Sequence, residues 1–170
     1  MKTYLAIIFT VFIANFLAAQ SNNCACCTEK HSEFDFWIGE WVVTQSNGSP
    51  AGKNTLIKIQ NNCILQENWV SATSGYTGTS TNFYNTNTKQ WEQIWVDNQG
   101  QSLHLKGNKM GNQMILKTDE GINANGVPFF HRITWTANRD GTVRQLWETI
   151  TNGDQINVAF DGLYKKANKN

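Results

Sequence analysis

The chain has 170 residues and a formal net charge of +1, and only 16% of its residues are charged. This length suits one domain. The Lys and Arg residues are not clustered, which argues against nucleic-acid binding, and the lysines near the C-terminus are interpreted as a solvated tail.

Residues 1–20 have the pattern of a secretory signal peptide. Lys2 supplies the positive start, residues 5–17 are nearly all apolar, and Ala18 and Ala19 offer small side chains for cleavage. The apolar run is too short to span a membrane comfortably and no second run follows it. We therefore expect an exported protein, periplasmic or extracellular, with no membrane span in the mature chain.

Residues 21–36 are expected to form an N-terminal arm, and this arm carries three of the four cysteines, namely Cys24, Cys26 and Cys27. In an oxidising compartment an even count predicts disulfides, and four cysteines allow three connectivities. Adjacent cysteines rarely bond to each other because the geometry is strained. We expect Cys63 to pair with one arm cysteine and to tie the arm to the domain, while the other two pair or stay free.

A metal or redox site is the alternative for this arm. Thiolates and an imidazole at Cys24, Cys26, Cys27 and His31 lie close together in the sequence. Such ligands accept Cu(I) or Zn(II), although the spacing matches no standard zinc pattern.

Residues 37–166 are predicted to form a series of β-hairpins, followed by a tail at 167–170. Runs rich in Thr, Val, Ile, Trp and Tyr alternate with Gly, Asn and Asp, and only residues 24–36 allow a helical turn. About ten strands are expected from the spacing of these runs. They cover residues 37–45, 54–60, 64–72, 75–84, 90–96, 102–106, 113–118, 129–136, 143–150 and 155–164.

Three of these strands end on a tryptophan before a polar turn with glycine, at Trp95, Trp135 and Trp147. Short links of this kind make successive strands antiparallel neighbours. An up-and-down order favours a closed barrel, which removes the sheet edges. A β-sandwich is the alternative.

Residues 33–43, with the sequence EFDFWIGEWVV, place an aromatic cluster before a Gly-x-Trp and a β-branched pair. This block resembles the opening of an uncharacterised family of secreted lipocalin-like (calycin) proteins, and Gly39-x-Trp41 is similar to the calycin Gly-x-Trp. The resemblance covers nearly the whole mature chain. It implies a closed antiparallel barrel, a plug segment before the first strand and a small ligand inside, with Trp37 and Trp41 in structural roles.

The alternation of strand side chains predicts an inward face rich in aromatic rings. Ligand sites have this character, being mostly apolar with a few placed polar groups. The predicted ligand-binding residues are Tyr76, Tyr84, Trp91, Gln93, Trp95, His131, Trp135, Gln145 and Trp147. We expect them to hold a small hydrophobic or aromatic molecule, which Gln93, Gln145 and His131 orient.

Other readings of the interior stay open at this point. The seven tryptophans could fill the barrel, which would leave an interaction module with residues 119–128 as its contact loop. The architecture is similar to that of nitrobindins, which carry haem on a histidine near the chain end. Here residues 155–164 contain no histidine, so His131 is the better candidate of the two barrel histidines, ahead of His104.

Fatty-acid-binding barrels of similar shape hold a carboxylate with Arg and Tyr. Arg132, Arg144 and Tyr164 could copy that arrangement, although strand alternation places both arginines outward. No catalytic residues are assigned, because no Gly-x-Ser-x-Gly or His-Glu-x-x-His motif occurs. An enzyme is an alternative by analogy with lipocalin-like enzymes alone, and the sequence names no cofactor.

Overall fold

The computed structural model describes residues 24–168; the expected signal peptide lies outside the described residues. Of the described part, 62% is strand and 5% is helix. Within it, no helix has the length and apolar character needed to cross a membrane. The elements are α1 (Glu29–Ser32), the 3₁₀ helix η1 (Asp35–Trp37), β1 (Gly39–Gln45), β2 (Pro50–Ile59), β3 (Ile64–Ser71), β4 (Thr77–Asn85), β5 (Gln90–Asp97), β6 (Ser102–Met110), β7 (Gln113–Thr118), β8 (Gly121–Ile122), β9 (Pro128–Ala137), β10 (Val143–Thr151) and β11 (Gln155–Lys166).

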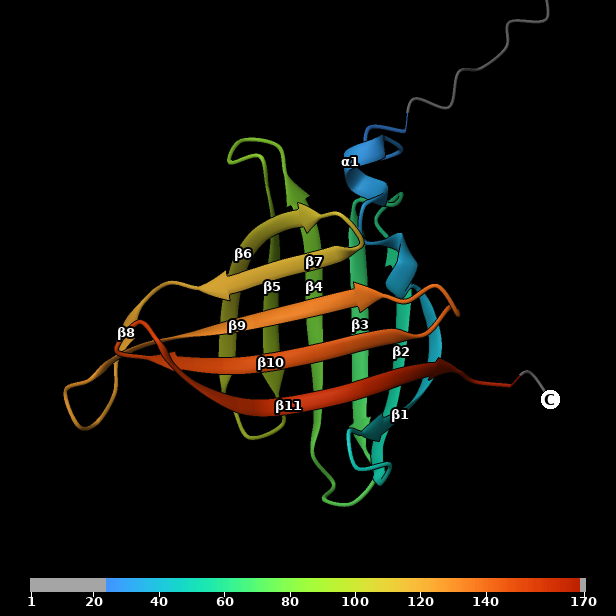
Figure 1. Cartoon of the computed structure of the whole chain (residues 1–170). Coiled ribbons are helices and arrows are strands. Elements are labelled where there is room, and N and C mark those ends of the chain that lie inside the picture. Colours follow the sequence, from blue (N-terminus) through green and yellow to red (C-terminus); the bar gives the residue numbers. More distant parts are fainter. Residues whose placement is uncertain (1–23, 169–170) are drawn as a thin grey trace, which may run out of the picture.

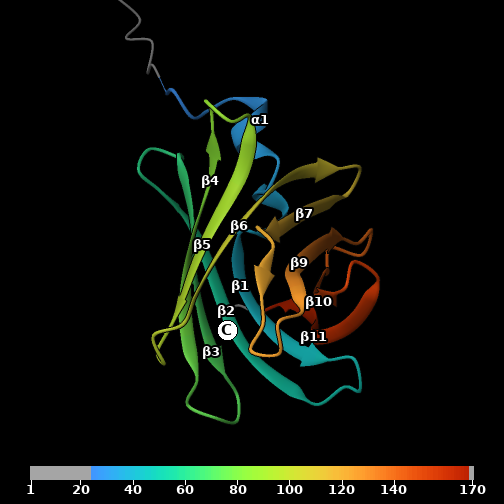
Figure 2. The same cartoon turned by 90° about the vertical axis from the view of Figure 1, so that its left-hand side faces the viewer.

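Ten of the strands form a closed antiparallel barrel, as expected from the sequence. Neighbours pair in order from β1 to β7, then β9, β10 and β11, and β11 pairs with β1 to close the ring. In Figure 2, β3 to β5 form one wall on the left and β9 to β11 form the opposite wall on the right. Each of the ten strands has two neighbours, so the barrel has no open edge. This closure excludes the β-sandwich.

Three strand assignments differ from expectation, the first being β2, which begins at Pro50 and not at residue 54. The sequence predicts a loop at residues 107–111, but β6 continues to Met110 and turns only at Gly111. Gly107 suits this strand because the backbone of β7 approaches it closely: a Cβ there would lie 2.1 Å from the carbonyl oxygen of Ile115. The expected long loop after residue 118 contains the short extra strand β8, which pairs only with β9.

Residues 24–38 close one end of the barrel, and we call them the plug. Figure 1 shows α1 above the ends of β3 and β4. Phe34 and Trp37 are fully buried, stack with ring centroids 5.1 Å apart, and both contact Trp135 of β9. The structural role expected for Trp37 is therefore met by a ring packed in the barrel interior.

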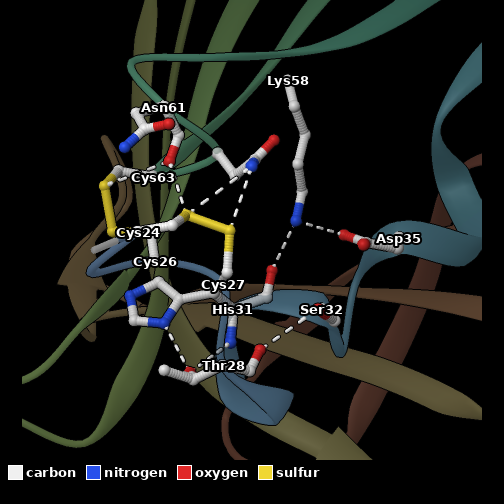
Figure 3. Close-up of a disulfide and its surroundings, with 11 residues drawn as sticks. Cys24, Cys26, Cys27, Thr28, His31, Ser32, Asp35, Lys58, Asn61 and Cys63 are labelled. Atoms are coloured by element: carbon white, nitrogen blue, oxygen red, sulfur yellow. Dashed lines mark hydrogen bonds and ion pairs between the residues drawn. A yellow bond between two sulfur atoms is a disulfide. The ribbon is translucent and has the colours of Figure 1, made fainter. Parts of the chain in front are cut away.

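One disulfide and an ion pair fix the plug to the barrel, and a second disulfide lies within the plug (Figure 3). Cys26 bonds Cys63 in the β2–β3 turn, as expected for one arm cysteine, and Cys24 bonds Cys27 within the plug. Lys58 of β2 lies 2.6 Å from a carboxylate oxygen of Asp35 and donates to the carbonyl of His31. These contacts connect the plug to the same hairpin at several points.

The Gly39-x-Trp41 pair begins β1 beneath the plug. Gly39 has φ of 129°, a conformation that L side chains rarely adopt. Trp41 is buried and donates from Nε1 to the carbonyl of Trp37 at 2.9 Å. The ammonium of Lys166, near the end of β11, lies 3.8 Å from the centroid of the Trp41 ring and donates to the carbonyl of Ile38. The first and last strands are thus joined at the plug end.

Candidate functional site

A cavity of about 270 Å³ lies inside the barrel, away from the plug. The β1–β2 and β3–β4 turns border it, whereas the disulfide-bonded β2–β3 turn lies at the other end. Trp135 separates the two regions, because its ring contacts Phe34 and Trp37 of the plug and also lines the cavity. We call the two halves of the barrel the plug end and the cavity end.

Aromatic side chains form most of the large surfaces of this cavity. The lining rings are Trp69, Tyr76, Trp95, Trp135, Trp147, Phe160 and Tyr164. Trp69 and Phe160 meet edge to face, with centroids 5.9 Å apart. The lining is thus an aromatic wall in which several rings support one another.

Three of these rings lie against glycines within strands. A Cβ at Gly78 would lie 2.1 Å from the Trp95 ring, and one at Gly52 would lie 2.7 Å from the Trp69 ring. Gly162 is related to Phe160 in the same way, at 2.5 Å. A glycine in a strand often marks such close approach. Each ring therefore occupies space beside a strand that a side chain at the glycine would otherwise fill.

A buried carboxyl group stands in this aromatic wall. Glu67 of β3 is 4% exposed; its Oε1 accepts from Asn54 Nδ2 at 2.7 Å and its Oε2 accepts from Ser80 Oγ at 2.6 Å. Burial raises the pKa of Glu67 to about 7, although both hydrogen bonds lower it. The hydrogen-bonded chain continues from Ser80 through Asn82 to Gln93, which also lines the cavity.

A second polar pair lines the opposite wall. The hydroxyl of Tyr164 in β11 donates to Oε1 of Gln145 in β10. Burial raises the pKa of Tyr164 well above its ordinary value, and the nearby carboxyl of Glu67 raises it further. Tyr164 is therefore a neutral hydrogen-bonding group at physiological pH.

A second hollow of about 330 Å³ adjoins the first and shares Tyr76, Trp95 and Trp147 with it. His131 lines this hollow, and its Nδ1 lies 3.1 Å from Nε1 of Trp147. An indole N–H only donates, so Nδ1 is the acceptor and the ring proton resides on Nε2. Burial lowers the pKa of His131, which favours this neutral form. Asp97 accepts from the Tyr76 hydroxyl at 3.1 Å in the same hollow.

Six of the nine sequence-predicted ligand residues line the main cavity, namely Tyr76, Gln93, Trp95, Trp135, Gln145 and Trp147. His131 lines the adjoining hollow. Tyr84 and Trp91 also lie inside the barrel but at the plug end. The Tyr84 ring meets His31 edge-on, and Trp91 meets Phe34 and donates from Nε1 to Glu33. These two rings therefore lie beneath the plug and line neither the main cavity nor the adjoining hollow.

Sequence reasoning missed Glu67, Trp69 and Phe160. Glu67 is a charged residue, a type that is mostly exposed, although it shares a strand face with the apolar Leu65 and Trp69. The glycines at positions 52, 78 and 162 are the signal that could have found the rings, since each interrupts a strand pattern without a turn.

The alternative metal site at Cys24, Cys26, Cys27 and His31 is overturned. All four cysteines of the chain are in disulfides, so no thiolate remains to bind a metal. Nδ1 of His31 lies 2.7 Å from the Thr28 hydroxyl in α1. Among residues 24–168, no group of three or more His, Cys, Asp or Glu side chains is arranged to hold a metal ion.

The arginines of the fatty-acid alternative are also elsewhere. Arg132 pairs with Glu148 at 2.9 Å, Arg144 binds Asp161 through two nitrogens at 2.7 and 2.8 Å, and neither lines the cavity. Only Tyr164 of that set does. A carboxylate in this cavity would therefore meet Glu67 without an arginine to neutralise it.

Comparisons with known proteins add no family. Neither the models of known protein families nor the curated proteins contain a match to this chain. The barrel, its plug and its aromatic cavity are thus the basis for a functional assignment.

Proposed function

We propose that this protein is an exported, lipocalin-like barrel that binds a small hydrophobic or aromatic molecule. The observation that carries the proposal is the cavity at the end of the barrel away from the plug, walled by Trp69, Trp95, Trp147 and Phe160. Burial of an apolar ligand against such rings supplies affinity through the hydrophobic effect.

The construction of the wall favours a binding site over a packing gap. Trp95, Trp69 and Phe160 each lie over a strand glycine, so part of each ring takes up space that a side chain would otherwise fill. The cavity volume of about 270 Å³ is near the lower end of known ligand sites, roughly 300–1,000 Å³. A compact ligand with one or two rings suits this space.

Export is part of the same proposal. The two disulfides use every cysteine of the chain, and disulfides persist in oxidising compartments. The apolar start of the sequence is consistent with a secretory signal. The lipocalin-like part of the proposal rests on the sequence of residues 33–43.

The test measures indole binding by calorimetry in the disulfide-bonded protein, with Trp95→Ala, Trp147→Ala and Val96→Ala. Val96 neighbours Trp95 in β5 but is 44% exposed on the outer face, so it is the matched control. We expect both tryptophan variants to lose at least about tenfold in affinity, since 1.4 kcal/mol of lost contact is a factor of ten. Val96→Ala should bind as the wild type does.

Circular dichroism establishes that each variant keeps its fold. Unchanged indole affinity in both tryptophan variants would refute the assigned site. Native mass spectrometry of protein taken from its own export compartment then identifies the natural ligand by its mass.

A further inference from the structure

The charge balance of the cavity is one-sided. Glu67 is the only residue with a formal charge among those that line the main cavity, in the part of the chain that the structure describes. Arg132 and Arg144 are engaged on other carboxylates, away from this lining. A ligand deep in this cavity therefore meets one acidic group and no basic one.

Glu67 keeps hydrogen-bonding capacity for a ligand. Its two oxygens accept one hydrogen bond each, from Asn54 and Ser80, whereas a carboxylate offers about four acceptor positions. Both partners are donors, which favours the ionised form of the group. Among the described residues, no Lys, Arg or His forms an ion pair with Glu67. Burial without a counter-charge is unfavourable for a carboxylate, so a cationic ligand would supply what the protein lacks.

The surrounding rings suit the same kind of ligand. Trp69, Trp95 and Trp147 line the cavity together with Glu67, and the faces of tryptophan rings attract cations. Trp69 and Trp95 lie close against Gly52 and Gly78, where a side chain would displace them. An aromatic box around one buried acid is complementary to an organic ammonium ion, whose carbon skeleton packs on the rings.

We propose that the cavity selects a small organic ammonium compound, with Glu67 as its counter-ion and the tryptophan rings as its cage. This inference rests on the proposed ligand-binding function and names the class of ligand. The ammonium group donates to Glu67, and the apolar part of the ligand lies towards Trp95 and Trp147. A carboxylate of the same size is rejected, because it would be buried beside Glu67.

Binding of such a cation depends on pH in a defined direction. The pKa of Glu67 is about 7 in the empty cavity, so the carboxyl group is mostly protonated below that pH. It must then lose its proton before it can pair with a cationic ligand. The titratable groups that act on Glu67 from other elements are Tyr164 of β11 and Tyr76 before β4. Burial raises the pKa of both, so they remain neutral, while Asn54 and Ser80 do not titrate. Affinity for the cation therefore rises between pH 5 and pH 8.

The experiment compares three ligands that share an indole ring and a two-carbon chain. Tryptamine carries an ammonium, tryptophol a hydroxyl and indole-3-propionate a carboxylate. Calorimetry at pH 8 with the disulfide-bonded protein should show tryptamine binding at least about tenfold more tightly than tryptophol, and indole-3-propionate more weakly than both. At pH 5 the preference for tryptamine over tryptophol should shrink at least about tenfold.

Glu67→Gln keeps the size of the side chain and removes its charge. We expect this variant to bind tryptophol as the wild type does and to lose the preference for tryptamine. Glu40→Gln, on the exposed face of β1, is the matched control and should leave the preference intact. The pH series on the wild type gives an independent test if Glu67→Gln does not fold.

The outcomes separate the two proposals. Equal affinity for tryptamine and tryptophol, or tighter binding of indole-3-propionate, would overturn the ammonium ligand while leaving the binding barrel in place. A tryptamine preference that persists in folded Glu67→Gln would overturn the role of Glu67. If indole and all three derivatives fail to bind, the proposed function fails together with this inference.

Discussion

The plug end and the cavity end of this barrel are built from the same strands but are filled in different ways. At the plug end, Phe34 and Trp37 come from the N-terminal plug, not from a strand. Phe34 packs against Trp91 and Trp135, and Trp37 packs against Trp135. At the cavity end, most of the rings belong to the strands themselves, and Trp69, Trp95 and Phe160 lie against strand glycines. The number of aromatic residues therefore does not decide whether a barrel is hollow; the surface on which each ring rests does.

Strand β5 shows the difference within a few residues. Trp91 and Trp95 both point inward, but Trp91 is 2% exposed beneath the plug, whereas Trp95 lines the cavity over Gly78. The neighbouring strand provides space for one ring and the plug covers the other. A tryptophan at an inward position thus serves packing or binding according to its height in the barrel.

Polar groups also differ between the ends. At the plug end, Asp35 is paired with Lys58 of β2, beside the disulfide that joins Cys26 to Cys63. At the cavity end, Glu67 is held by Asn54 and Ser80 with part of its capacity unused. The first arrangement holds the plug on the barrel, and the second leaves acceptor positions of Glu67 unused.

Leucines two positions apart in β6 allow a direct comparison of the ends. Leu105→Ala should lower the free energy of unfolding by about 3–5 kcal/mol, because Leu105 is fully buried in the packed region and truncation leaves a void. Leu103→Ala should cost only about 1 kcal/mol, since Leu103 is partly exposed and already borders empty space. Urea unfolding measures both, and equal losses would mean that the ends are packed alike.

Removing each disulfide in turn tests how much the plug contributes to the stability of the protein. Cys26 and Cys63 are 37 residues apart, so replacing both with Ser should cost about 4 kcal/mol of stability through loop entropy in the unfolded chain. Cys24 and Cys27 are 3 apart, and the same change there should cost about 1.5 kcal/mol. The second double variant is the control for the loss of cysteine, and both are measured by chemical unfolding.

If the plug only covers the barrel, the Cys26→Ser and Cys63→Ser pair will unfold as the control pair does. A much larger loss than in the control means that the plug is part of the cooperative core. Indole binding in the folded variants should persist in both cases, because the cavity lies at the other end.

The fold was largely predictable because its signals are local. Hairpin turns at residues such as Asn98 and Gly100 delimit the strands, and short links force antiparallel neighbours. The exceptions are places where a distant backbone decides the outcome. Gly107 reads as a turn residue, yet the approach of Ile115 in β7 makes it a strand residue. The pairing of Cys26 with Cys63 in particular also depends on how the plug sits over the β2–β3 turn.

The sequence predicted which side chains point into the barrel, but not at which end of the barrel each one lies. Strand periodicity correctly grouped Trp95 with Trp147 on the inner face. It could not tell that Tyr84 and Trp91 lie under the plug, because periodicity carries no information about which end of a strand is covered. Glu67 was missed since the hydrogen bonds that permit its burial come from strands on both sides of β3.

The pH dependence of stability tests the buried acid of the cavity end. Glu67 has a pKa of about 7 in the folded protein and about 4.5 when unfolded, so the folded state binds its proton more tightly. Between these values the folded state holds more protons than the unfolded state, and stability decreases as pH rises. The loss amounts to about 3 kcal/mol and is complete above pH 7. Glu67→Gln cannot ionise and lacks this loss.

The measurement is the free energy of unfolding of the wild type and Glu67→Gln at pH 5 and pH 8 without ligand. All other titrating groups are common to both proteins, so their contributions cancel in the difference between the two pH profiles. We expect the variant to gain stability relative to the wild type by about 2–3 kcal/mol between pH 5 and pH 8. Parallel profiles would mean that Glu67 stays ionised in the empty cavity. In that case the plug end and the cavity end would differ in packing alone, since the carboxyl would be as well solvated as a surface group.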